Sequence, residues 1–109
     1  MKPLNQIKVD EIPEAIVVLQ ETVGLTKAHY ELTSAKLKVV FAELYNAISD
    51  KKTEKAKECE VYSNLEYQAQ LHRISDAMTA YHKALGELEA YQQKFQLLYL
   101  REKNHNQTY

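Results

Sequence analysis

The most regular pattern of apolar positions lies in the second half of the chain. Between Tyr67 and Tyr99, apolar or aromatic residues recur at alternating intervals of three and four, and Gln92 is the one polar member. The positions are Tyr67, Leu71, Ile74, Met78, Tyr81, Leu85, Leu88, Gln92, Phe95 and Tyr99. This spacing is the a/d signature of a helix that packs lengthwise against another helix.

The helix that carries this pattern is expected to be very long. From Glu54 onward there is no proline, and the only glycine is Gly86, which falls outside the a/d positions. We therefore predict one unbroken helix over about residues 54–103, which at 1.5 Å per residue is roughly 75 Å long. The polar tail 104–109 is expected to be frayed.

The first half of the chain predicts two further helices. Residues 1–10 have no clear period and are expected to be extended or mobile. Apolar residues then repeat at helical spacing from Ile12 to Val23, with Pro13 in the first turn, where proline is tolerated. Gly24 favours a helix end there, giving a helix over about 11–23; the alternative is that Gly24 only bends one continuous helix.

A second helix is expected over about residues 27–49. Its apolar residues cover more than one face, and a helix apolar over so wide an arc is usually buried on two sides, in a bundle or an oligomer. Ser49–Thr53 breaks the pattern and supplies a turn, with Thr53 as a cap for the next helix. The predicted fold is an all-α single domain over 1–109, either a helical hairpin or a three-helix bundle.

The lengths of these helices predict an interface. A helix of about 23 residues spans roughly 35 Å, so after a short turn it covers the long helix only to about Met78. The apolar stripe continues beyond that point and is widened by Ala77, Ala84, Tyr91 and Leu98, which precede its a positions. We therefore expect self-association, most simply as an isologous dimer through the long helix. The candidate oligomer or partner interface is Tyr81, Leu85, Leu88, Tyr91, Phe95, Leu98 and Tyr99.

Composition supports a helical protein of the cytoplasm. Only two glycines and two prolines occur in 109 residues, and the formal net charge is −1, which gives no overall attraction to nucleic acid or anionic membranes. No apolar run is long enough to span a bilayer, and the first residues lack the apolar core of a secretory signal. The single Cys59 excludes an intramolecular disulfide, which fits a reducing compartment.

No pattern in the sequence indicates an enzyme. The four histidines are His29, His72, His82 and His105, and none lies three or four residues from another. His72 and Asp76 share a helical face, but two residues alone are more typical of a surface contact than of a metal site. No catalytic residue, metal or cofactor is predicted, and an enzyme site assembled at a dimer interface is the least favoured hypothesis.

A weaker signal concerns single-stranded DNA. The most basic stretch lies at the expected turn, where Lys51, Lys52, Lys55 and Lys57 are candidate nucleic-acid contacts. The eight tyrosines could stack on bases, although most fall on apolar helix faces. Acidic residues interleave with the lysines, so a solvated helix start is the favoured interpretation.

The segment AYHKALGELEAYQQKFQLLYLREKN (Ala80–Asn104) resembles short helical proteins encoded in the early and recombination regions of tailed phages. The likeness extends over about Glu54–Asn104, where a Glu/Lys-rich start leads into a long helix of alternating Ala, Tyr, Leu and Glu. The apolar first half of the chain has no counterpart in it, and no functional residue is carried over. The resemblance implies an accessory or inhibitory protein that binds proteins of host or phage DNA metabolism.

Two function classes follow from these patterns. The first is a non-enzymatic helical protein-interaction module that self-associates and binds an unidentified protein partner. The alternative is an accessory factor that contacts single-stranded DNA through the basic turn and tyrosines. Because DNA contacts depend steeply on salt, an oligonucleotide titration at low and high salt separates the two.

Overall fold

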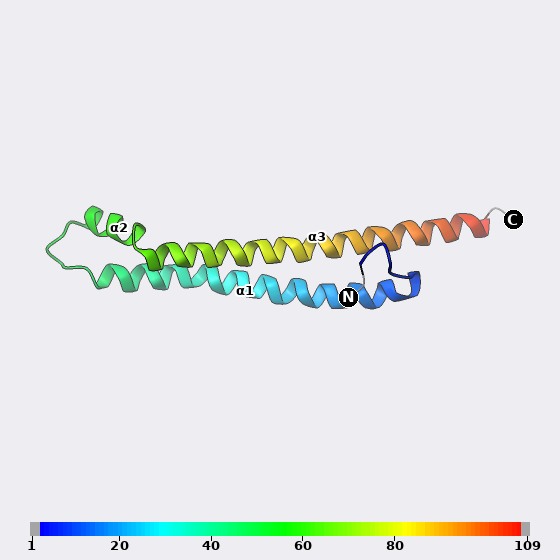
Figure 1. Ribbon diagram of the computed structural model, residues 1–109, viewed down its shortest axis with the longest axis horizontal. Coiled ribbons are helices and arrows are strands. Elements are labelled where there is room, and N and C mark those ends of the chain that lie inside the picture. Colours follow the sequence, from blue (N-terminus) through cyan, green and yellow to red (C-terminus); the bar gives the residue numbers. More distant parts are fainter. Residues whose placement is uncertain (1–2, 108–109) are drawn as a thin grey trace. The chain divides into compact units, whose positions relative to one another are not determined.

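The structure is built from helices. The computed structural model describes residues 3–107, in which a 3-10 turn, η1 (Val9–Glu11), is followed by α1 (Ile12–Asn46), α2 (Glu54–Tyr62) and α3 (Leu65–Gln107) (Figure 1). No strand occurs among these residues. The predicted all-α class with one very long C-terminal helix is confirmed.

The expected helix end at Gly24 is wrong. α1 passes through Gly24 and Thr26 without interruption, and no described glycine has a positive φ. A glycine inside a helix costs only about 1 kcal/mol relative to alanine, and the left-handed conformation that is common at helix ends does not occur at Gly24. The alternative of one continuous helix is the correct one. α1 ends at Asn46, three residues before the predicted Ser49.

The expected unbroken helix from Glu54 is also wrong, because residues 63 and 64 separate α2 from α3. The Ser63 hydroxyl donates to the Cys59 carbonyl at 2.9 Å, and Asn64 Oδ1 accepts the Glu66 N–H at 2.8 Å. Such short polar side chains compete with helical backbone bonds and start a new helix instead. The predicted cap at Thr53 is confirmed, since its Oγ1 accepts the Ala56 N–H at 3.2 Å.

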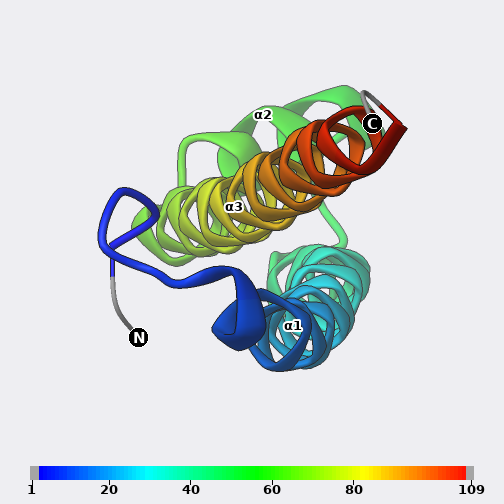
Figure 2. The ribbon, with the colours of Figure 1, turned by 90° about the vertical axis from the view of Figure 1, so that its right-hand side faces the viewer.

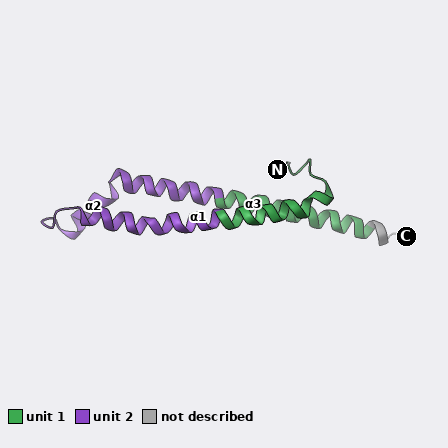
Figure 3. Ribbon diagram, turned by 90° about the horizontal axis from the view of Figure 1, so that it is seen from below, with its two compact units in different colours: residues 1–25, 81–109 green, residues 26–80 purple. Residues whose placement is uncertain are grey.

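The end of α3 extends further than expected. The helix continues to Gln107, so residues 104–107 of the predicted frayed tail are helical, while 108 and 109 lie outside the described residues. The chain divides into two compact units, of which unit 1 contains residues 1–25 and 81–109 and unit 2 contains residues 26–80 (Figure 3).

In unit 1 the start of α1 packs against the C-terminal part of α3 around a small apolar core. The buried members are Ile7, Ile12, Ala15, Leu19 and Tyr91, and Leu4, Ile16, Leu88, Phe95 and Leu98 pack around them. Each large apolar side chain that folding removes from water contributes roughly 1.5–3 kcal/mol to the stability of the folded state. This core is the main apolar cluster that the described residues form.

The segment before η1, residues 3–8, is called the lead-in here. It belongs to this core, contrary to the expectation that residues 1–10 are extended or mobile. Gln6 N–H donates to the Pro3 carbonyl at 3.0 Å and closes a turn. Lys94 Nζ on α3 donates to the carbonyl oxygen of Leu4. The segment thereby runs from α1 to the side of α3 (Figure 2) and places Ile7 in the core.

Unit 2 is held together differently. The centre of the α1–α3 contact contains Gln70, 3% exposed, and the buried Thr33. Gln70 Nε2 donates to the Thr33 carbonyl at 2.9 Å, and Gln70 Oε1 accepts from Arg73 at 2.9 Å. These bonds satisfy a carboxamide that would otherwise be costly to bury.

An aromatic cluster lies where α2 meets α1 and α3 in unit 2. Its rings have centroids 5.5–6.4 Å apart and are mostly tilted or edge-on, and its members are Phe41, Tyr45, Tyr62 and Tyr67. Aromatic pairs at these separations are favourable beyond the area that they bury. The cluster therefore anchors the short α2, whose Val61 is fully buried.

Candidate protein-interaction surfaces

The residues predicted as an interface all lie on the part of α3 that belongs to unit 1. Tyr91 is buried in the core, and Leu88, Phe95 and Leu98 pack against it. Tyr81 and Leu85 are half-buried, and Tyr99 is exposed. Much of the expected interface is therefore covered by the chain's own α1 and lead-in, and Tyr99 is the predicted residue that remains open.

The register of α3 explains this outcome. Its buried residues in unit 2 are Gln70 and Ala77, and in unit 1 they are Ala84 and Tyr91, so burial recurs every seven residues. Ala77, Ala84 and Tyr91 are three of the four positions that the sequence showed as widening the stripe, whereas Gln70 was not among them. The small alanines allow α1 to approach closely, so they define the centre of the contact. Leu71 and Met78, each one residue after a buried position, lie at the edge of the α1–α3 contact.

As a result, unit 2 leaves large apolar side chains in water at seven-residue spacing. On α1, Leu32 is 58% exposed and Val39 is 55% exposed. On α3, Leu71 is 43% exposed and Met78 is 38% exposed. Single exposed apolar residues are common, but rows at heptad spacing are typical of helices that accept another helix.

Unit 1 has an open apolar surface near the end of α3. Leu97, Tyr99 and Leu100 are all more than half exposed. Beside them is a shallow groove of about 550 Å³, lined by Leu4, Asn5, Ala90, Gln93, Lys94 and Leu97. Tyrosine and leucine next to an apolar groove suit protein contacts, because a ring buries area while its hydroxyl stays hydrogen-bonded.

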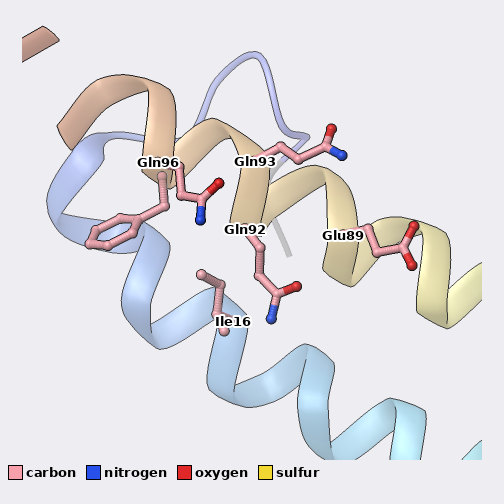
Figure 4. A pocket seen from close by; sticks show the side chains of 6 residues that line it. Ile16, Glu89, Gln92, Gln93 and Gln96 are labelled. Atoms are coloured by element: carbon pink, nitrogen blue, oxygen red, sulfur yellow. The ribbon is translucent and has the colours of Figure 1, made fainter. Parts of the chain in front are cut away.

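A second groove in unit 1 is lined by amides. It has a volume of about 470 Å³, and its walls are Ile16, Glu89, Gln92, Gln93, Phe95 and Gln96 (Figure 4). Gln92 projects toward Ile16 of α1, whereas Glu89 extends away along α3. With one carboxylate and three carboxamides, this groove can accept and donate hydrogen bonds, but it offers no acid–base or nucleophile pair.

A groove with several charged residues in its walls lies on unit 2 and includes the buried Gln70. Its volume is about 510 Å³, and it is lined by His29, Thr33, Lys36, Gln70, Arg73, Asp76, Ala77 and Ala80. Gln70 orients the guanidinium of Arg73 through their 2.9 Å hydrogen bond. The groove is open, so it is suited to a polar contact at a protein surface rather than to enclosing a substrate.

The lysines predicted to contact nucleic acid lie in the turn and on α2. Lys52 forms an ion pair with Glu60. Lys57 Nζ lies 3.4 Å from the Asp50 carboxylate and 5.1 Å from the centre of the Tyr45 ring. Lys51 and Lys55 are exposed. Half of the predicted basic patch is thus engaged within the chain.

Within the described residues, no group of three or more histidine, cysteine, aspartate or glutamate side chains could hold a metal ion. None of the described helices is apolar over a stretch long enough to cross a bilayer. Comparison with protein-family models, curated proteins and solved structures finds no match to this chain.

Proposed function

We propose that this chain is a non-enzymatic helical protein-interaction module of the cytoplasm, which self-associates and binds a protein partner. The observation that carries the proposal is the pair of exposed apolar rows in unit 2, Leu32 with Val39 on α1 and Leu71 with Met78 on α3. Each such side chain that a second helix covers contributes roughly 1.5–3 kcal/mol to association.

The resemblance of Glu54–Asn104 to helical proteins of phage early regions gives the proposal its specific form. In this form the protein is an accessory or inhibitory factor that acts by binding to a protein of host or phage DNA metabolism. The open surface of Leu97, Tyr99 and Leu100 is the candidate contact for that partner. Binding to single-stranded DNA has less support, because Lys52 and Lys57 are already paired with acidic residues.

Sedimentation velocity at chain concentrations between about 1 and 100 µM tests self-association. A contact through a few side chains of one helix is small, so we expect a dissociation constant in the micromolar range. We expect the weight-average mass to rise from monomer toward dimer across this range. A constant monomer mass up to the highest concentration would contradict the self-association.

Affinity capture tests the partner contact. The immobilised wild-type chain is compared with Leu97→Ser/Tyr99→Ser. Glu87→Ala, at an exposed position of α3 that lines none of the grooves described above, serves as the control. We expect a protein from the native host that the wild type and the control retain and the double variant loses. Equal capture by all three proteins would exclude this surface as the partner contact.

A further inference from the structure

The part of α1 in unit 2 carries two helix-packing seams on nearly opposite faces. The first faces α3 and includes the buried Thr33. The second consists of Ala28, Leu32, Ala35, Val39 and Ala42, at intervals of four, three, four and three. All five of these side chains are exposed. The sequence indicated a helix buried on two sides, and the chain's own elements cover only one of them.

We infer that this second seam is the self-association surface, and that its occupant is α1 of a second copy, packed parallel and in register. This inference rests on the proposed self-association and specifies its site. A two-fold axis along α1 places Leu32 against Leu32 of the second copy, with Ala35 against Ala35 one layer further along. The alanine layers let the two helices approach closely.

Charge complementarity identifies the occupant and its orientation. Glu31 and Lys38 lie on one flank of the second seam, and Lys36 and Glu43 lie on the other. In a parallel pair, a residue on the first flank meets the residue five positions later on the second flank of the partner helix. Glu31 then meets Lys36 of the second copy, and Lys38 meets Glu43, each twice by symmetry.

The four flanking residues are available for these pairs. All four are exposed, and none forms an ion pair with another described residue. An antiparallel pair is less favourable, because it retains only the contacts between Glu31 and Lys38, places His29 near Lys36 of the second copy and leaves Glu43 without a basic residue opposite. A foreign helix would need to reproduce the same charge order, whereas a second copy supplies it without further conditions.

Substitutions on the seam give the first test. Leu32→Glu puts one carboxylate from each chain into the same dimer layer and is expected to weaken dimerisation at least about 100-fold in sedimentation equilibrium. The matched control is Leu65→Glu, at an exposed leucine of α3 in the same unit that belongs to neither apolar row, and it should leave the dimer unchanged. Circular dichroism of both variants checks that their helix content matches the wild type.

Charge exchange tests the register. Glu31→Lys and Lys36→Glu should each weaken the homodimer about 5- to 20-fold at low salt, because attractive pairs become repulsive. Mixing the two single variants should restore a dimer that contains one chain of each, and the double variant should restore the homodimer. No recovery in either case would exclude the parallel register.

Disulfide trapping tests the orientation, in a Cys59→Ser background because Cys59 is exposed. In a parallel dimer, Ala28→Cys should cross-link to itself, and so should Ala42→Cys. In an antiparallel dimer, a mixture of Ala28→Cys and Val39→Cys chains should cross-link instead. That second pattern overturns the parallel arrangement.

The outcomes separate this inference from the proposed function. If the wild type dimerises but Leu32→Glu does not weaken it, the α1 seam is wrong and self-association stands. If the wild type is monomeric at every concentration, both statements about self-association are wrong. A dimer lost with Leu32→Glu, retained with Leu65→Glu and trapped through Ala28→Cys supports both.

Discussion

Units 1 and 2 use the same two helices but are stabilised in different ways. In unit 1, Ile12 and Leu19 are almost completely buried, and Ile7 of the lead-in packs into the same core. In unit 2, the centre of the contact is the hydrogen-bonded pair of Gln70 and Thr33. Unit 1 therefore gains mainly from the hydrophobic effect, and unit 2 gains more from specific polar and aromatic contacts.

The difference bears on the site of the proposed self-association. In unit 1 one set of large apolar side chains is packed between α1, α3 and the lead-in, while another set stays exposed: Val17, Val18 and Leu25 of α1 and Leu97, Tyr99 and Leu100 of α3. In unit 2 a polar residue occupies the centre, and leucine, valine and methionine side chains remain outside it. The proposed self-association covers the α1 row of unit 2, because the charges that flank this row are complementary to those of a second copy.

The largest expected effect is removal of a core side chain from unit 1. Leu19→Ala should lower the free energy of unfolding by about 2–5 kcal/mol, because it leaves a cavity in a closely packed site. Urea unfolding followed by circular dichroism, at a concentration where the chain is monomeric, measures it. Leu25→Ala is the matched control on the same helix; Leu25 is exposed, so its loss should stay within about 0.5 kcal/mol. Similar losses in the two variants would show that the unit 1 core is not packed as described.

A smaller effect is expected from the lead-in. Ile7→Ala should cost about 1–3 kcal/mol and should speed hydrogen exchange in residues 4–8, because Ile7 anchors a short segment that can detach locally. Val9→Ala, at a partly exposed position beside it, should change little. If Ile7→Ala leaves both stability and exchange unchanged, the lead-in does not contribute to the core.

The polar centre of unit 2 predicts a third effect. Gln70→Ala should cost about 1–2 kcal/mol, because it removes the bond to the Thr33 carbonyl and the partner of Arg73. Gln92→Ala, an exposed glutamine on the same helix, is the control and should be near neutral. A Gln70 variant as stable as the control would mean that this hydrogen bond adds nothing to unit 2.

The smallest effect concerns the break between α2 and α3. Asn64→Ala should cost about 1 kcal/mol through loss of the bond from the Glu66 N–H. Thermal unfolding measures the change, and His72→Ala, at an exposed position of α3 away from the break, provides a comparison. An increase in both stability and helix content in Asn64→Ala would show instead that a continuous helix is the preferred state.

Several features follow from the sequence alone. The 3–4 spacing of apolar residues, the near absence of glycine and proline, and the threonine before Glu54 are sufficient for the all-α class, the long C-terminal helix and the cap at Thr53. These depend on local propensity and periodicity, which a single chain segment determines by itself. The wide apolar arc of residues 27–49 likewise indicated two packing faces on one helix.

Other features were decided only by tertiary structure. Gly24 stays helical because an uninterrupted α1 can pack against α3 in each unit, which outweighs a local preference of about 1 kcal/mol. The row of Gln70 and Ala77 forms the buried centre of the α1–α3 contact, and the row of Leu71 and Met78 does not. This depends on how closely the two helices approach. The sequence could not decide it, because neighbouring rows of one wide apolar stripe look alike. The lead-in reaches the core through Lys94, nearly the whole chain away, so no local pattern could have placed it.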